Sequence, residues 1–538
     1  MALAISGYEF WLSCYGMRPE AEDAPELMQN IQSRLPVKEA ARTCVLSKSW
    51  LHAWSTIPIL RFDVRRGKSM KLVDGDRTLI RYLRDNIPIE RFDLTIDIES
   101  QESASHAEKW IGAITTKSCL REMSLSIDIA LLRTSLTLPD EILSGENLTK
   151  IRVSASNGIH YVWMTTSYHP VIKCVCLREL YLNGVRISEE ALHDILSSCS
   201  LLEKIELLDS CKGFKTFKVK NLLRLYELRI DLDAVHSTAL EISDVPNLSV
   251  FSYDLHVCRP QMPIIPFNAL SISLGRSVTR LMLGGVITDN ACLETIKTEF
   301  PFLESLTLDM TSWMLGSFHF TCASIKRLSL LSCRHMLIDV QVYAPKLFFF
   351  EFGGNTLPSL LFPVSSLKQI KVSLSLNPLI DANFFLKMRE TLTLSRMCYL
   401  NIITDNSKLP LDIDIDDLRT RLLFPPARNV QELAFQTVAD ECLWERSQFF
   451  DAFFEICHPK HVFARPDSRF RHNNHFCRLM LREVLEKKTR IAYWPHYLKH
   501  VQIRQYRHQK WKPLTVSHRS FLDGSAPGVY MYFKLMWR

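Results

Sequence analysis

A short apolar pattern that returns along most of the chain constrains its fold more than any other feature. An apolar residue is followed by two other residues, a second apolar residue, one other residue and a third apolar residue. LREMSL is a complete copy, with Leu120, Met123 and Leu125. From Leu120 to Leu367 successive copies begin 20 to 30 residues apart. Recurrence at such a period predicts an array of similar structural units that pack on one another.

This period is close to that of leucine-rich repeats, in which each copy supplies a short strand with alternate side chains pointing inward. Two connecting segments have the apolar spacing of helices, over 188–199 with Ser188 as N-cap and over 288–300. Gly284-Gly285 and Gly353-Gly354 follow strands and fit tight turns. We therefore predict an α/β repeat array. Further copies are LTKIRV, LRELYL, LEKIEL, LYELRI, LSVFSY, VTRLML, LESLTL, IKRLSL, LFFFEF and LKQIKV, with VQELAF and LKHVQI as late members.

The segment before the array differs from it, because its apolar residues have the spacing of helices. Leu27, Ile31 and Leu35 form one helical stripe, which Pro36 ends. A second stretch, VKEAARTCVLSKSWLHAWS, predicts one or two more helices and carries Trp50 and Trp54 one turn apart. Fewer than 50 residues cannot bury so many apolar side chains among themselves. The segment therefore either binds a partner or caps the first repeat.

The stretch SRLPVKEAARTCVLSKSWLHAWSTIPILRFD resembles the F-box of plant F-box/leucine-rich-repeat proteins. CLRELYLNGVRIS, SCSLLEKIELLDSC and YWPHYLKHVQI are similar to the repeats and to the C-terminal, FBD-like region of that family. The resemblance implies an α/β fold: a three-helix F-box, then an irregular leucine-rich-repeat solenoid, then a C-terminal cap. The expected boundaries are a tail over 1–22, the F-box over 23–64, repeats over 65–440 and the cap over 441–538.

The family resemblance further implies a non-enzymatic adaptor that needs no cofactor. Its F-box would bind a Skp-type linker and, through it, a cullin, while the repeats hold an unknown target protein for ubiquitination. Three residues are expected to seat the F-box on the first repeat: Trp54, Pro58 and Leu60. The residues expected to face the linker are Leu27, Ile31, Leu35, Pro36, Val45, Leu46 and Trp50.

The start of the F-box departs from the family pattern, which opens with Leu-Pro-Asp-x-Leu-Leu. Here the aligned stretch is DAPELM, so Asp23 stands where a large aliphatic residue is usual. Loss of one buried leucine from an interface costs about 1–3 kcal/mol, or roughly tenfold or more in affinity. A second hypothesis therefore stays open, in which the chain is a leucine-rich-repeat scaffold or inhibitor with a decayed F-box.

Other chemistry has weaker support in the sequence. From position 451 onward 17 Lys and Arg face six Asp and Glu, but they are dispersed, so we expect a solvated basic face rather than a nucleic-acid site. Cys457, His461, His472 or His475, and Cys477 offer four zinc ligands at a spacing that matches no common finger. In LDIDIDDL the alternating Asp412, Asp414 and Asp416 fit a solvated strand or a helix start better than a calcium loop. Common catalytic motifs are missing from the sequence, and we predict no enzyme.

The remaining composition bears on where the protein works. The 15 cysteines are scattered without a CxxC pair, which is typical of reduced, buried thiols in the nucleus or cytoplasm. The first 22 residues lack a basic start, and Glu9 interrupts their apolar stretch, so no signal peptide is predicted. We expect a protein of the nucleus, the cytoplasm or both, with no membrane partner.

Overall fold

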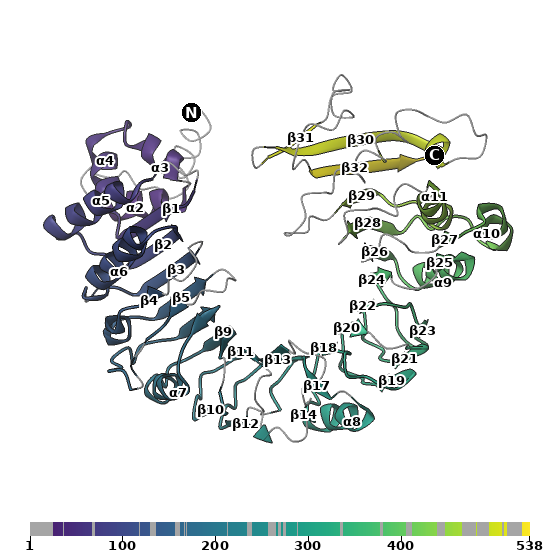
Figure 1. Ribbon diagram of the computed structural model, residues 1–538, viewed down its shortest axis with the longest axis horizontal. Coiled ribbons are helices and arrows are strands. Elements are labelled where there is room, and N and C mark those ends of the chain that lie inside the picture. The colour runs from purple at the N-terminus through teal and green to yellow at the C-terminus, as the bar shows by residue number, and fades with distance from the viewer. Residues whose placement is uncertain are drawn as a thin grey trace, which may run out of the picture. The chain divides into compact units, whose positions relative to one another are not determined.

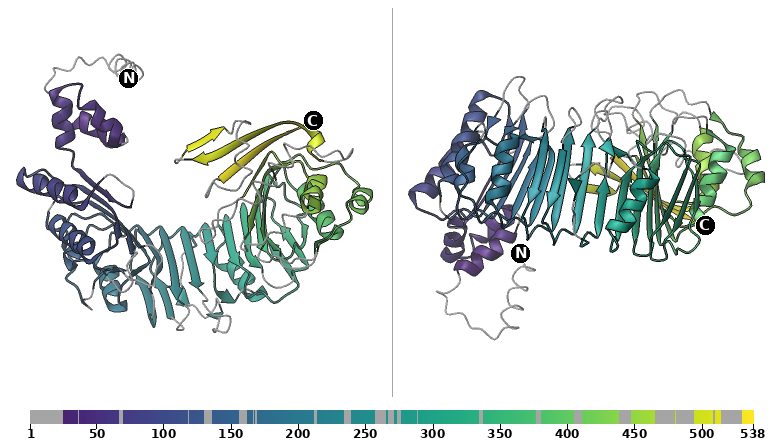
Figure 2. Two further views of the ribbon diagram at one scale, coloured as in Figure 1. Left: turned by 45° about the horizontal axis from the view of Figure 1, so that its top comes forward. Right: turned by 90° about the horizontal axis from the view of Figure 1, so that it is seen from below.

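The computed structural model of the chain divides into two compact units. Figures 1 and 2 show its helices and strands. Unit 1 comprises residues up to Leu232 with Ser243–Val245, and unit 2 comprises Asp233–Ile242 and the residues from Pro246 onward. The residues that the structure describes are 25–35, 37–66, 70–117, 119–129, 136–155, 162–165, 167, 169–211, 214–233, 239–256, 265–266, 271–272, 276–287, 289–333, 337–376, 380–404, 411–437, 447–464, 480, 494–507, 510–513 and 530–538.

Unit 1 is built on a parallel sheet whose strands follow one another in chain order. In the second strand Phe92, Leu94 and Ile96 are all buried, whereas the residues between them are partly exposed. One face of the sheet is therefore covered and the other, here called the open face, is not. The strands are β1 (Ile59–Val64), β2 (Arg91–Ile98), β3 (Glu122–Ile129), β5 (Lys150–Ala155), β7 (Glu179–Asn183), β9 (Lys204–Cys211) and β11 (Glu227–Asp233).

A second layer of helices and short strands covers the face of this sheet opposite the open face. Helix α6 turns Trp110, Ile111 and Ile114 inward, and all three are fully buried. The predicted helix over 188–199 is confirmed as α7, with Ser188 as its N-cap. The layer contains α5 (Leu72–Arg84), α6 (Gln101–Thr115), the 3₁₀ helix η1 (Asp140–Ser144), α7 (Glu189–Ser198), the parallel strands β4 (Leu136–Thr137), β6 (Val162–Trp163) and β8 (Val185–Arg186), and β10 (Thr216–Lys220).

Within its described residues, unit 2 repeats the same plan with nine parallel strands in chain order. The strands that carry a predicted copy of the pattern again bury its apolar residues, as Leu306 and Leu308 show. The strands are β13 (Val250–His256), β16 (Arg280–Leu283), β18 (Ser305–Asp309), β20 (Arg327–Cys333), β22 (Phe349–Gly354), β24 (Gln369–Leu376), β26 (Met397–Thr404), β28 (Val430–Thr437) and β29 (His461–Ala464).

The covering layer of unit 2 is also mixed. The predicted helix over 288–300 is confirmed, with Leu293, Ile296 and Phe300 buried. Its members are β14 (Ile265–Pro266) with β17 (Val286–Ile287), β12 (Ala239–Ser243) with β15 (Ser271–Ile272), β19 (Ser317–Thr321) with β21 (Asp339–Tyr343) and β23 (Ser359–Leu361), β25 (Ile380–Asp381) with β27 (Leu411–Asp412), α8 (Asn290–Glu299), α9 (Ala382–Thr393), α10 (Ile415–Arg421) and α11 (Ser447–Ile456).

The end of the array does not follow the predicted repeat. LKHVQI was expected as a late repeat, but it lies in β30 (Leu498–Arg507), which runs antiparallel to β32 (Tyr530–Trp537) and β31 (Lys510–Pro513). Strand β32 in turn pairs antiparallel with β29. The prediction for LKHVQI is therefore wrong, because alternation of apolar residues does not distinguish parallel from antiparallel strands.

Two smaller predictions can also be compared with the structure. Gly285 has φ +65°, as the predicted tight turn requires. Gly353 and Gly354 were expected in such a turn as well, but they lie inside β22 and pair with β24, so that prediction is wrong.

Aromatic side chains close the C-terminal end of unit 2. The Phe454 ring lies 4.2 Å from Trp494 of the 3₁₀ helix η4 (Trp494–Tyr497) and 5.6 Å from Trp537, measured between ring centroids. Trp537 donates its indole N–H to the carbonyl of Pro459 (2.8 Å), and the His458 ring stacks on it at 4.0 Å. Across the described ranges, the helices are too short or too polar to cross a membrane.

Candidate functional site

Three short helices precede the sheet of unit 1: α2 (Pro25–Arg34), α3 (Val37–Thr43) and α4 (Lys48–Ser55). Helix α2 packs against both of the others, and α3 packs against α4. Ser47 caps α4 by accepting a hydrogen bond from the backbone N–H of Trp50 (3.2 Å). The sequence favours this arrangement, because a serine just before a helical stripe satisfies an N–H that would otherwise lack a partner.

The interior of this three-helix segment is small and polar rather than aliphatic. Ala40 and Ala53 are buried, and so is Gln32, which is 1% exposed. The amide of Gln32 donates to the Thr43 hydroxyl (2.7 Å) and to the carbonyl of Trp50 (3.1 Å), so one side chain ties all three helices together. Sequence reasoning missed Gln32, because a polar residue beside an apolar stripe is usually assigned to the solvent.

Four large apolar residues of the segment lie on its outside. Of the residues predicted to face a linker, Leu27, Val45 and Leu46 are 47%, 78% and 51% exposed. Leu51, which was not predicted, is 52% exposed. Ile31, Leu35 and Trp50 are half-buried, and Pro36 lies outside the described residues. Isolated exposed apolar residues are ordinary, but four on one short segment with an interior of alanine and glutamine favour a partner surface.

The residues predicted to seat the helices on the first repeat lie at the junction with the sheet. Trp54 is half-buried in α4, and Leu60 is buried within β1. The carbonyl of Pro58 accepts hydrogen bonds from the backbone N–H groups of Glu90 (2.8 Å) and Arg91 (3.1 Å). The three-helix segment therefore leads into the first strand through a hydrogen-bonded connection.

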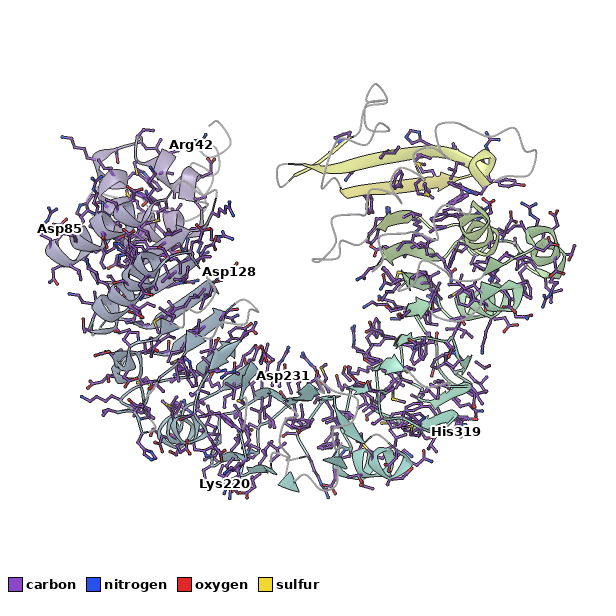
Figure 3. All side chains as sticks on the ribbon, in the orientation of Figure 1. Arg42, Asp85, Asp128, Lys220, Asp231 and His319 are labelled. Carbon is purple, nitrogen blue, oxygen red and sulfur yellow. The ribbon has the colours of Figure 1, made fainter. Side chains whose placement is uncertain are left out.

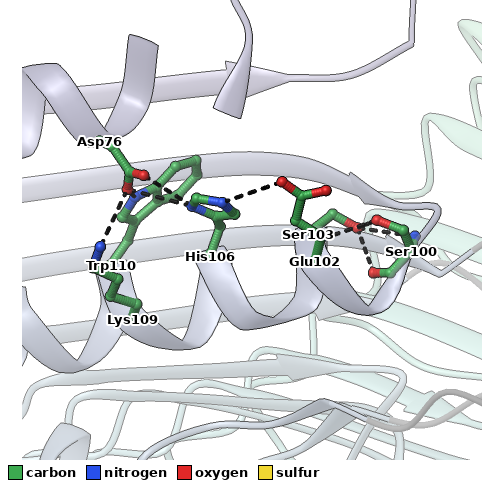
Figure 4. A network of polar contacts seen from close by, with 7 residues as sticks. All are labelled: Asp76, Ser100, Glu102, Ser103, His106, Lys109 and Trp110. Carbon is green, nitrogen blue, oxygen red and sulfur yellow. Dashed lines mark hydrogen bonds and ion pairs between the residues drawn. The ribbon is translucent and has the colours of Figure 1, made fainter. Parts of the chain in front are cut away.

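A cluster of titratable groups joins α5 to α6 next to this junction (Figure 4). Asp76 accepts a hydrogen bond from the Trp110 indole N–H (2.7 Å) and lies 3.2 Å from Nδ1 of His106, whose Nε2 is 3.9 Å from Glu102. Burial by itself raises the pKa of Asp76, but the Trp110 hydrogen bond and the charges of His106 and Lys109 outweigh it, so this pKa lies below its ordinary value. These contacts act between two packed helices, and we interpret the cluster as a structural tie.

The open face of the unit 1 sheet carries charges of alternating sign. Strand register places six charged residues side by side at the first position of six neighbouring strands, and three neighbouring pairs among them form ion pairs of 3.5, 2.6 and 3.0 Å. In Figure 3 Asp128 and Asp231 lie on this face, whereas Lys220 and His319 lie on the opposite side of their units. The six charges at the first strand positions are therefore largely paired with one another within the sheet. The row consists of Arg91, Glu122, Lys150, Glu179, Lys204 and Glu227.

The two metal hypotheses receive no positive support from the described residues. Cys457 is buried and donates to the carbonyl of Phe453 (3.3 Å), while the His461 ring stacks on Tyr532 at 5.0 Å. His472, His475 and Cys477 lie outside the described residues. Within the described ranges, groups of three or more potential metal ligands do not occur. Asp414 is the N-cap of α10, accepting from the N–H groups of Asp416 (2.9 Å) and Asp417 (3.2 Å), which confirms a helix start.

Parallel strands at a period of 20 to 30 residues, each burying alternate aliphatic side chains under a mixed layer of helices and strands, define the class of this chain. It is an α/β protein with a large parallel sheet, as in leucine-rich-repeat proteins.

Comparison with known proteins places the chain more narrowly. Residues 107–257 match the repeats of a family described as "FBD-associated F-box protein At5g56370, LRR repeats". "Putative F-box/LRR-repeat protein At3g18150" of Arabidopsis thaliana is 25% identical over 46% of this chain and 48% of its own length. "F-box protein At1g80960" of the same plant is 27% identical over 46% of this chain and 55% of its own length. "Putative FBD-associated F-box protein At5g56390", also from that plant, is 24% identical over 51% of this chain and 66% of its own length.

These matches confirm the predicted resemblance: the chain is similar to plant F-box/leucine-rich-repeat proteins, including FBD-associated ones. The chain spans about half the length of the curated relatives it matches.

Proposed function

We propose that this chain is the substrate-recognition subunit of an SCF-type E3 ubiquitin ligase. In this proposal α2, α3 and α4 form a three-helix F-box over 23–64 that binds a Skp-type linker protein and, through it, a cullin. The repeats over 65–440 hold the target protein, and the region over 441–538 caps the array. The tail over 1–22 has no assigned role, and we place the protein in the nucleus, the cytoplasm or both.

The observation that carries the proposal is the exposed apolar surface of the three-helix segment. Leu27, Val45, Leu46 and Leu51 are the large apolar residues that this segment leaves outside, while its interior is held by Gln32 and two alanines. Interface anchors are typically side chains of this kind, presented by helices to a partner groove. A segment that only capped the first repeat would have no reason to expose them.

The proposed mechanism needs no active site in this chain. Binding of linker and target to one polypeptide converts ubiquitin transfer from a bimolecular encounter into a reaction within a complex, and the gain is effective concentration. We therefore propose a non-catalytic adaptor that requires no cofactor.

The test is a pull-down of purified Skp-type linker by the full chain and by Val45→Asp. Val45 is 78% exposed, so its replacement should leave the fold intact while placing a charge in the proposed interface. The expected result is a loss of linker affinity of about tenfold or more, as for truncation of an interface anchor. Val73→Asp is the matched control, because Val73 is 56% exposed on α5, outside the proposed surface.

Three outcomes separate the hypotheses. Binding by the wild type and by Val73→Asp, with loss in Val45→Asp, supports the ligase subunit. Failure of the wild type with rescue by Asp23→Leu indicates a decayed F-box, which favours a scaffold or inhibitor that binds only through its repeats. Failure of both the wild type and the Asp23→Leu variant contradicts linker binding altogether.

A further inference from the structure

The open face of the unit 2 sheet carries two arginines that no carboxylate within the described residues neutralises. Arg280 is the first residue of β16 and Arg327 the first of β20, and register places both beside Ser305 of β18. Both arginines are exposed. We call Arg280, Ser305 and Arg327 the arginine row.

Unit 1 shows that cations without a counter-charge on the neighbouring strand are not a general property of the repeats. At the equivalent first strand position Lys150 pairs with Glu179 at 2.6 Å, and Lys204 pairs with Glu227 at 3.0 Å. Opposite charges on neighbouring strands stabilise a sheet by such pairing. In the arginine row the residue between the two cations is a serine, which offers no charge. Among the described residues, neither arginine therefore has a counter-charge on the neighbouring strand, and both can bind a group outside the chain.

One of the two arginines is held in place by aromatic rings. The Arg327 guanidinium carbon lies 4.2 Å from the ring centroid of Phe349 and 5.9 Å from that of Phe348. Stacking covers one face of the guanidinium and leaves its N–H groups, which lie in the plane, free to donate. A pre-oriented guanidinium suits bidentate binding of a carboxylate, since less side-chain freedom is lost on binding.

The surroundings extend the positive surface and limit the kind of partner. Four more exposed cations lie just before β16, β22, β24 and β26, and within the described ranges no carboxylate pairs with them. Two acids do lie close by, although each is bound to a lysine: Glu304 to Lys326 (2.6 Å) and Glu351 to Lys371 (2.5 Å). A nucleic-acid backbone, with about one charge per 1.7 Å of duplex, would meet both acids. The four cations are Arg276, Lys346, Lys368 and Arg396.

We propose that the arginine row binds an extended segment of a partner protein that carries Asp or Glu at alternate positions. Strands are about 4.8 Å apart, so the Cα atoms of Arg280 and Arg327 are separated by about 10 Å. The Arg327 guanidinium lies over Phe349 of β22, on the far side of β20 from Ser305, so the two cations stand on either side of Ser305. Alternate residues of an extended segment are about 7 Å apart, so that two successive acids each meet one guanidinium. The exposed Met282 and the hydroxyl of Thr307, at the next outward positions, contact the segment's backbone.

This inference rests on the proposed function insofar as the segment belongs to the ligase target, but its test does not involve the linker. The probe is a fluorescein-labelled nonapeptide of alternating glutamate and serine, measured by fluorescence anisotropy with the full chain at low salt. The comparison peptide has glutamine in place of glutamate. We expect binding of the glutamate peptide alone, and at least tenfold weaker binding by Arg280→Glu/Arg327→Glu, the loss typical of charge-assisted hydrogen bonds.

The matched control is Arg77→Glu/Arg224→Glu, which changes the net charge by the same amount at two exposed arginines of unit 1. Retained binding by this control, with loss in the arginine-row variant, supports the proposal. Equal loss in both variants, or no binding by the wild type, overturns it. Tighter binding of a random DNA duplex that the arginine-row variant abolishes also overturns it, because the surface would then serve nucleic acid.

Failure of this test and failure of the linker pull-down are distinguishable. The arginine-row variant should still bind the linker, and Val45→Asp should still bind the glutamate peptide, because the two surfaces lie on different elements.

Discussion

The same substitution at two helical glycines should change the stability of unit 1 in opposite directions. Gly75 lies within α5 and Gly112 within α6. A Cβ added at Gly112 meets nothing within 4 Å, whereas one added at Gly75 would lie 2.6 Å from Cζ2 and 2.8 Å from Cη2 of Trp110. Replacing glycine by alanine in a helix interior stabilises by about 1 kcal/mol when there is room.

The clash at Gly75 should outweigh this gain because Trp110 cannot move aside. Its ring is fully buried, donates its N–H to Asp76 (2.7 Å) and packs edge-on against Phe62 at 4.9 Å between centroids. Overpacking of a rigid core costs about 1–3 kcal/mol, and a contact this short belongs at the upper end. We therefore expect Gly75→Ala to lower the free energy of unfolding by about 1–2 kcal/mol, and Gly112→Ala to raise it by about 1 kcal/mol.

Urea denaturation of the full chain, followed by circular dichroism, measures both values. Since Gly75 and Gly112 belong to the same unit, they should act on the same unfolding transition. A third variant isolates the cause: in a Trp110→Leu background the clash is removed, and Gly75→Ala should become neutral or stabilising. The reasoning is refuted if Gly75→Ala stabilises the wild type as much as Gly112→Ala does, or if Trp110→Leu leaves its effect unchanged.

Two further predictions concern unit 2. Burial lowers the pKa of His458 from 6.5 to about 4 and also lowers that of His461, so the unfolded chain binds more protons between these values and acid should destabilise. After discounting for partial exposure, we expect the free energy of unfolding, measured by urea titration, to fall by on the order of 1 kcal/mol between pH 7 and pH 5. The fall should be smaller in His458→Gln. A variant that loses as much stability as the wild type would contradict the role of His458. Asp289 caps α8 by accepting from the Cys292 N–H (2.7 Å), so Asp289→Ala should cost about 1 kcal/mol in the same assay, whereas an unchanged midpoint would show that the cap is dispensable.

The sheet could be predicted from the sequence because burial in a repeat array depends on alternation alone. Leu303, Leu306 and Leu308 are buried just as the pattern requires. The direction of the last strands could not be predicted, since Val501 and Ile503 alternate in the same way whether β30 runs parallel or antiparallel. Strand direction is decided by the connection between strands, and the apolar pattern carries no information on it.

The three-helix segment was predictable only in part. The predicted helix is present as α2, which carries Leu27 and Ile31 but ends one residue before Leu35. The apolar spacing does not reveal whether such residues pack inward or outward. Here Gln32 takes the interior because its amide finds two acceptors on the neighbouring helices, at Thr43 and Trp50. Such a pairing needs the three-dimensional contact, so the sequence alone assigns the buried glutamine wrongly.

The open face of the sheet explains why recognition residues are the hardest to predict in a repeat protein. Each copy must bury the same three apolar positions, so those positions repeat, whereas the outward positions are free to differ. An outward charge is structural when a neighbouring strand supplies its counter-charge, as Glu179 does for Lys150. The same charge is available for binding when the neighbour is neutral, as Ser305 is between Arg280 and Arg327. The distinction depends on which residues of different repeats lie in register, and loops of unequal length hide that register from the sequence.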